Sequence, residues 1–204
     1  MPIAVFLLQA APAASVSAVI AAMIPFALAA LAILFAISLY NTLVRSRVRT
    51  REAWSGIDVQ LKRRASLIPN LVETVRGYAT HEHEVFAEVA EARGALAKAA
   101  GPAASAVADG FLTQALGRLM AVAENYPALQ AAGNFAQLQE DLTDTEEKIA
   151  YARQFYNQNA LDYNARIQSF PGNVFASWFR FEPVTFFAAE PGVSEDVAVK
   201  FAKV

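Results

Sequence analysis

The 204-residue chain has no cysteine, only two histidines, and no more than nine glycines and nine prolines. The absence of cysteine excludes disulfides, thiol catalysis and thiolate metal sites. The two histidines, His81 and His83, lie two positions apart, so on a helix their side chains point to opposite sides and cannot chelate one metal. The sequence also lacks a glycine-rich phosphate loop and a Gly-x-Ser-x-Gly nucleophile motif. We therefore expect no metal, no cofactor and no enzymatic activity.

Charged side chains are missing from residues 1–44, after which arginines follow at alternate positions, Arg45, Arg47, Arg49 and Arg51. As a helix, residues 16–40 are long enough to cross a hydrocarbon core of about 30 Å. A cleaved signal peptide is the alternative, but such peptides carry a basic segment before a shorter apolar run. We predict a transmembrane helix at 16–40. The apolar residues 1–15 either lie in the interface or extend this helix.

The basic residues that follow the apolar run predict how the chain crosses the membrane. Between Arg45 and Arg64 there are seven lysines or arginines and only two acids. The positive-inside rule then places the C-terminal domain in the cytoplasm and the N-terminus outside, in a single pass through the cell membrane. We expect the four alternating arginines to lie at the membrane interface. Past Arg64 the chain is acidic, which argues against nucleic-acid binding.

Apolar residues recur every three or four positions through residues 41–170, as is typical of amphipathic helices. Glycine or proline separates four such helices, at 77–80, at 101–102 and near Pro127. We predict an all-α protein in which an antiparallel four-helix bundle at 41–170 follows the membrane helix. The first helix of the bundle should continue from the membrane span, and Pro69 should kink it or start a new helix.

The third and fourth predicted helices each carry a stripe of mainly apolar residues at helical spacing. The third helix carries Phe111, Ala115 and Leu119. The fourth has a coiled-coil-like seam of nearly five heptads, formed by Phe135, Leu138, Leu142, Thr145, Ile149, Ala152, Tyr156, Asn159 and Tyr163. The polar members of this seam, Thr145 and Asn159, are expected to set its register or oligomeric state. Acidic residues beside it, such as Asp144 and Glu146, are interpreted as a solvated helix face.

Residues 171–204 differ in composition from the rest of the chain. Six aromatic residues fall within a short stretch, namely Phe175, Trp178, Phe179, Phe181, Phe186 and Phe187. The favoured interpretation is a hydrophobic cap on one end of the bundle. The alternative is a docking surface for a partner chain or for the lipid interface, where aromatic residues are enriched. Residues 196–204 alternate apolar and polar side chains, which predicts a short strand in this irregular tail.

Several blocks of the sequence resemble the LemA family of bacterial membrane proteins. They include Trp54-Ser55, residues 57–64 (IDVQLKRR), residues 67–73 (LIPNLVE), His81-Glu82, Tyr156-Asn157, Tyr163-Asn164 and Phe170-Pro171. Ser66 stands where the family usually has Asp, and residues 99–110 are idiosyncratic. The resemblance implies a single-pass anchor followed by a LemA-like four-helix bundle. No catalytic residues follow from it, because the family has no established enzymatic activity.

Polar residues in the best-matched blocks and aromatic residues of the tail are our candidates for interaction with partners. They are Asp58, Gln60, Lys62, Arg63, Arg64, Asn70, Glu73, Trp178, Phe179 and Phe181. The leading hypothesis is a membrane-anchored, non-catalytic scaffold that forms a homo-oligomer or recruits other membrane proteins, with no small-molecule substrate. An accessory or sensor subunit that regulates a membrane protease or transporter is the alternative. A metal-dependent enzyme centred on His81, His83 and Glu84 is the weakest hypothesis.

Overall fold

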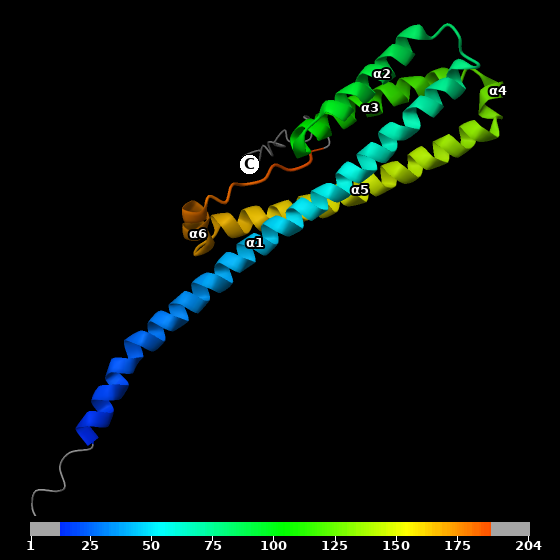
Figure 1. Ribbon diagram of the computed structural model, residues 1–204. Coiled ribbons are helices and arrows are strands. Elements are labelled where there is room, and N and C mark those ends of the chain that lie inside the picture. Colours follow the sequence, from blue (N-terminus) through cyan, green and yellow to red (C-terminus); the bar gives the residue numbers. More distant parts are fainter. Residues whose placement is uncertain (1–12, 189–204) are drawn as a thin grey trace, which may run out of the picture.

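The computed structural model describes residues 13–188, and all regular structure within that range is helical. There are six helices in this part of the chain (Figure 1): α1 (Ala13–Arg76), α2 (His83–Lys98), α3 (Gly101–Ala123), α4 (Pro127–Gln130), α5 (Gly133–Gln168) and α6 (Gly172–Phe179). The expected all-α class is therefore confirmed. The strand expected at 196–204 lies outside the described residues.

Helix α1 is a single helix of 64 residues with two different surroundings. Its first half projects alone from the rest of the molecule (Figure 1), and its large apolar side chains between Met23 and Ile37 are 51–78% exposed. It is the one helix of the described chain that is long and apolar enough to cross a membrane, and the mean hydropathy of its most apolar window is 2.3. From residue 40 onward α1 packs against other helices. We call residues 40–188 the helical body.

The expectation that Pro69 would start a new helix is wrong, because α1 continues through it to Arg76. A proline has no N–H to donate to the carbonyl four residues earlier, which here belongs to Ala65. The side chain of Arg93 in α2 supplies the missing donor, since its Nε donates to the Ala65 oxygen at 3.0 Å. The contact from α2 therefore replaces the hydrogen bond that the proline ring removes from α1.

In the helical body α5 lies lengthwise along α1, and α2 lies along α3 (Figure 1). Helices α1 and α5 run antiparallel, because Thr50 contacts Asn159 near one end and Arg64 contacts Glu146 further along. The buried face of α3 includes Ala108, Leu112, Ala115, Leu116 and Leu119. Phe111, which we expected in this stripe, is 56% exposed. Both residue sets have helical spacing, so spacing alone does not select between them. The short helix α4 was not predicted.

After α6 the chain turns back at Arg180, whose φ is 53°, and residues 181–188 run extended along α5. We call this segment the strap. Asn164 exchanges two hydrogen bonds with the backbone of Val184: its Nδ2 donates to the carbonyl at 2.9 Å, and its Oδ1 accepts from the N–H at 3.0 Å. Asn157 makes the same pair with Phe187, at 3.1 and 2.9 Å. Two side chains of α5 therefore replace a neighbouring strand.

The tyrosine directly before each of these asparagines adds one more hydrogen bond to the strap. Tyr163 donates from its hydroxyl to the carbonyl of Glu182 at 2.9 Å, and Tyr156 donates to that of Thr185 at 2.6 Å. Burial raises the pKa of both tyrosines, so each hydroxyl stays protonated and able to donate. The two Tyr-Asn pairs are seven residues apart, a helical rise of about 10 Å, which matches three residues of extended chain. This match explains why the Tyr-Asn pair repeats after seven residues.

The strap predicts a specific loss of stability for Asn164→Asp. The carboxylate keeps an acceptor for the Val184 N–H but places a second acceptor against the Val184 carbonyl, so both the donor and a favourable contact are lost. We expect the free energy of unfolding at neutral pH to fall by about 1–3 kcal/mol, the usual cost of a broken buried hydrogen bond. Urea unfolding of the full chain in detergent, followed by circular dichroism, measures this change.

Asn70→Asp is the matched control, because Asn70 is exposed on α1 and makes no side-chain hydrogen bond within the described residues. Its free energy of unfolding should stay close to that of the parent. Equal stability of the two variants would mean that the strap contributes nothing to the fold.

Candidate functional site

A buried group of charges lies where α1, α3 and α5 meet. The side chain of Arg64 donates from Nη1 to Asp109 at 2.6 Å and lies 3.1 Å from the carboxylate of Glu146. Its Nη2 also donates to the hydroxyl of Thr113 at 3.1 Å. Arg64 and Asp109 are buried, whereas Glu146 is about half exposed. Burial raises the pKa of Asp109, and the adjacent Arg64 opposes part of that rise.

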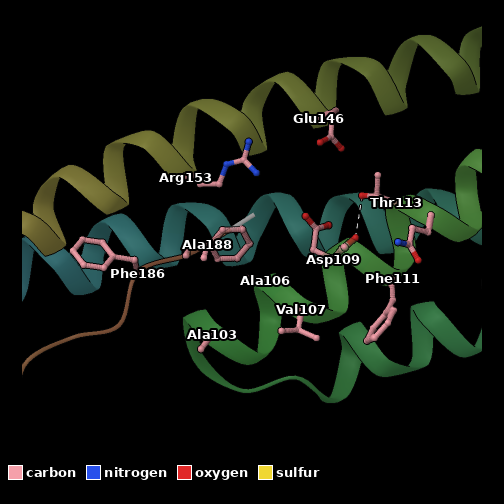
Figure 2. Close-up of a pocket in the computed structure, with 13 residues that line it drawn as sticks. Ala103, Ala106, Val107, Asp109, Phe111, Thr113, Glu146, Arg153, Phe186 and Ala188 are labelled. Atoms are coloured by element: carbon pink, nitrogen blue, oxygen red, sulfur yellow. Dashed lines mark hydrogen bonds between the residues drawn. The ribbon is translucent and has the colours of Figure 1, made fainter. Parts of the chain in front are cut away.

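Next to these charges lies a pocket of about 790 Å³, which we call the α3/α5 pocket. Figure 2 shows Glu146 and Arg153 on the α5 side, with Asp109 and Thr113 opposite them on α3. Apolar side chains of α3 and the strap line the other end, among them Val107 and Phe186. The pocket therefore combines an apolar wall with two carboxylates and one arginine, a composition typical of sites that bind small molecules or short peptide segments.

A second depression of about 540 Å³ follows the seam between α1 and α5, and we call it the α1/α5 groove. Gly56 and Ala53 form its floor on α1, while Tyr151 and Phe155 stand at its rim on α5. Tyr151 is 73% exposed and Phe155 is about half exposed. Gln60 lines the groove, and its side-chain oxygen is buried and accepts no hydrogen bond from the residues described.

Known proteins similar to this chain fall into one family. The sequence model of the LemA family matches residues 53–201, well over half of the chain. The chain belongs to the LemA family. Magnetosome protein MamQ 2 of Paramagnetospirillum magneticum is 32% identical over 74% of this chain, and Magnetosome protein MamQ of Magnetospirillum gryphiswaldense is 30% identical over the same share. Protein LemA of Metamycoplasma hominis is 25% identical over 73% of the chain.

The chain spans 65% of the length of the two magnetosome proteins and 68% of that of the Metamycoplasma protein. None of these names indicates a catalytic activity. Membership in the LemA family confirms the resemblance inferred from the sequence blocks between Trp54 and Pro171.

In this LemA-family chain the polar candidates of α1 separate into three groups. Arg64 is inside the body, so it is a structural residue and not a surface contact. Gln60 lines the α1/α5 groove, and Arg63 reaches Asp144 on the groove's other wall at 3.3 Å. The remaining candidates lie away from both depressions: Asp58 pairs with Lys62 at 2.6 Å, and Asn70 and Glu73 are exposed.

The acidic residues and the polar seam of α5 make contacts that the sequence analysis did not predict. Asp144 and Glu146 do not face solvent alone, because each pairs with an arginine of α1. The buried Thr145 donates its hydroxyl to the Asp141 carbonyl of its own helix at 2.7 Å, so it makes no bond between helices. The bond across the seam comes from Thr50, whose hydroxyl contacts the Asn159 carbonyl at 3.2 Å.

The basic and aromatic candidates meet at the end of the body from which the apolar half of α1 emerges. Arg45, Arg49 and Arg51 are exposed, whereas Arg47 stacks over the Phe181 ring at 4.8 Å. The aromatic tail is divided: Phe181 and Phe187 are buried against α1 and α5, but Trp178 and Phe179 are exposed. Part of the aromatic tail is therefore buried in the body, and part of it is exposed.

Sequence reasoning missed Asp109 and the groove aromatics. Asp109 gave no signal, because a single acid in an alanine-rich helix has no expected partner. Tyr151 and Phe155 did carry one: they are four residues apart on α5 and lie outside its packing seam, so helical geometry places both on an outer face. Both histidines are exposed, at the turn before α2 and at its first residue.

Removing Arg64 is predicted to destabilise the protein strongly. Arg64→Met leaves the Asp109 carboxylate buried without its main partner, which typically costs about 3–5 kcal/mol. The double variant Arg64→Met with Asp109→Asn should recover most of this loss. Arg63→Met is the matched control, and it should change the free energy of unfolding little because water screens the exposed Arg63–Asp144 pair. A loss as large in the control as in Arg64→Met would contradict the buried-charge assignment.

The same variants have a defined pH dependence. Because burial raises the pKa of Asp109 above its usual 3.8, ionising it destabilises the folded state as the pH rises from that value through the folded pKa. Loss of Arg64 should raise this pKa further and so widen the pH range over which ionisation of Asp109 destabilises the folded state. The stability gap between Arg64→Met and the double variant should therefore shrink as the pH is lowered toward 4. Urea unfolding at a series of pH values measures the gap.

Proposed function

We propose that this chain is a membrane-anchored, non-catalytic scaffold that self-assembles or recruits other proteins at the membrane. The observation that carries the proposal is the continuity of α1, whose most apolar window is not buried against any other part of the described chain and whose other half is a central helix of the body. An unbroken helix transmits position and orientation from the bilayer to the body. In this proposal the long helices of the body form the antiparallel four-helix bundle of residues 41–170.

In the same proposal the body lies in the cytoplasm, and the chain crosses the cell membrane once. The support is the asymmetry of charge: the apolar half of α1 has no basic flank before it, and the exposed Arg45, Arg49 and Arg51 follow it. Basic groups near an anionic leaflet contribute on the order of 1 kcal/mol each. The arginines would then hold the body close to the membrane surface.

The α1/α5 groove is the proposed contact for partners. Exposed aromatic residues such as Tyr151 and Phe155 are the side chains most enriched in protein interfaces. The Gln60 oxygen would accept a hydrogen bond from an incoming segment, and its burial without a partner costs free energy until one arrives. Attachment to one membrane raises the effective concentration of the chains, so weak contacts would suffice for assembly.

The α3/α5 pocket favours a second candidate function, an accessory or sensor subunit that regulates a membrane protease or transporter. The converging Asp109, Glu146 and Arg153 would select a ligand, and the strap that closes the pocket would respond to it. This role requires one defined complex with a different protein, whereas a scaffold that self-assembles contacts copies of itself.

The absence of cysteine permits a direct test of orientation. Gln130→Cys places a single thiol on the exposed surface of α4, at the far end of the body. A membrane-impermeant maleimide should fail to label it in intact bacterial cells and should label it after permeabilisation. The matched variant Ala4→Cys should show labelling in intact cells. Labelling of Gln130→Cys in intact cells would reverse the orientation, and equal labelling of both would contradict a single crossing.

A photocrosslinking amino acid at position 151 tests the groove. We expect ultraviolet light to give adducts in cells from position 151 and none from Glu91, which is exposed on α2 away from the groove. Adducts at twice the mass of the chain support self-assembly, and one adduct of another mass supports the accessory subunit. If position 151 gives no more adduct than position 91, the groove is not a partner contact.

A further inference from the structure

Helix α6 is held against a short stretch of α1 between residues 40 and 47. The Tyr40 ring lies 4.8 Å from the ring of Phe179 and 5.9 Å from that of Phe181. Leu43 packs with Ala176 and Phe181 in one buried cluster. Gly172 and Ala176, the buried residues of α6, are small, so the helix lies close to its neighbours.

This stretch of α1 contains the boundary between its uncharged and basic parts. The uncharged run ends at Val44, and Arg45 is the first charged residue. Residues 40–47 rise about 10 Å along the helix axis. The interfacial layer of a bilayer is of similar depth, roughly 5–8 Å on each side of the hydrocarbon. If α1 crosses the membrane, its contacts place α6 at the level of the lipid headgroups.

The exposed side of α6 carries large apolar residues beside the polar Asn173 and Ser177. The apolar ones are Val174, Trp178 and Phe179, with Phe170 just before the helix, and we call these four residues the aromatic face of α6. Only Phe179 among them stacks on α1, against Tyr40, and it still leaves half of its surface exposed. Phe170 is 83% exposed, Trp178 76% and Phe179 52%. The helix contains no charged residue, and the exposed Arg180 follows it directly. In Figure 1, α6 lies at the end of the body from which the apolar half of α1 projects.

We propose that the aromatic face of α6 is a second membrane contact, which enters the headgroup region of the same leaflet through which α1 leaves the bilayer. The proposal rests on the anchoring role of α1. Tryptophan and phenylalanine are favoured at this depth, where an apolar ring meets lipid chains and polar groups remain hydrated. Arg45, Arg49 and Arg180, all exposed, would face the lipid phosphates.

The size of the aromatic face favours lipid over a second copy of the chain. At 150–250 Å² per ring, the exposed parts of its three aromatic side chains amount to roughly 400 Å². A stable protein interface needs about 800 Å² from each partner. A bilayer has no such requirement, because the main anchor is already in it and each ring adds its own burial.

A second contact would change what the anchor can do. A single helix across a bilayer leaves the body free to rotate about the helix axis and to vary in tilt. The aromatic face of α6 lies beside that axis, so its insertion removes the rotation. The α1/α5 groove would then face one direction relative to the membrane on every copy of the protein.

The chain has two tryptophans, Trp54 and Trp178, which makes fluorescence a direct test. In the full chain carrying Trp54→Phe, reconstituted into lipid nanodiscs, Trp178 is the only emitter. We expect its emission to shift to shorter wavelength relative to detergent-free unfolded protein. It should also lose intensity with lipids brominated near the headgroup, and lose less with lipids brominated near the bilayer centre.

Two further variants serve as controls. Trp178→Phe leaves Trp54, which lies ten residues past Val44, or about 15 Å along α1, and should escape quenching by every brominated lipid. If Trp54→Phe perturbs the fold, as circular dichroism would reveal, the difference between the parent and Trp178→Phe isolates the same signal. Phe35→Trp, in a chain with both natural tryptophans replaced by phenylalanine, reports on the anchor and should be quenched by deeply brominated lipid.

Each outcome decides one proposal. Quenching of Trp178 by aqueous iodide and not by brominated lipid would overturn the second contact. Shielding of Trp178 from both quenchers would overturn it as well and would identify the face as a contact with protein. In either case, quenching of the Phe35→Trp variant by lipids brominated near the bilayer centre would still support the anchoring role of α1. If Phe35→Trp also escapes the brominated lipid, the anchoring proposal itself fails.

Discussion

The continuity of α1 as a single helix is the constraint on which the rest of the structure depends. This helix is an exposed apolar rod before residue 40 and a packed element of the body after it. Because no flexible joint separates the two parts, every element packed on residues 40–76 has a defined height and direction relative to the apolar half. The positions of α5, α6 and the strap follow from their contacts with this one helix.

Side chains of the other helices pair with two polar groups of α1. Pro69 removes a backbone donor in the middle of the body, and Arg93 of α2 replaces it at the Ala65 carbonyl. Arg64, one residue earlier, brings a charge into the interior, where Asp109 of α3 and Glu146 of α5 balance it. Both contacts are specific in direction, so they favour one arrangement of the helices over others with the same apolar burial. Buried polar contacts of this kind stabilise little in net terms but select among packings.

The strap, a segment without regular structure, is also held in place by hydrogen bonds from the side chains of a helix. An extended chain needs hydrogen bonds from a neighbour, and here a helix provides them through Asn157 and Asn164 instead of through a backbone. The fit is geometric, since two turns of α5 rise as far as three residues of the strap extend. Its buried residues, Phe181 and Phe187, lie at opposite ends of the strap. The strap also borders the α3/α5 pocket, to which it contributes Phe186 and Phe187.

The sequence alone determined the all-helical class, the breaks between helices, the apolar rod and the family, because periodicity, helix breakers and runs of uncharged residues are local properties. It could not determine that Arg64 is buried, that Phe111 is exposed, or that the repeated Tyr-Asn pairs bind the strap. Each of these depends on which face of one helix meets another segment distant in the chain. Spacing of three and four residues allows more than one such face, and only the tertiary packing, through shape and paired polar groups, selects among them.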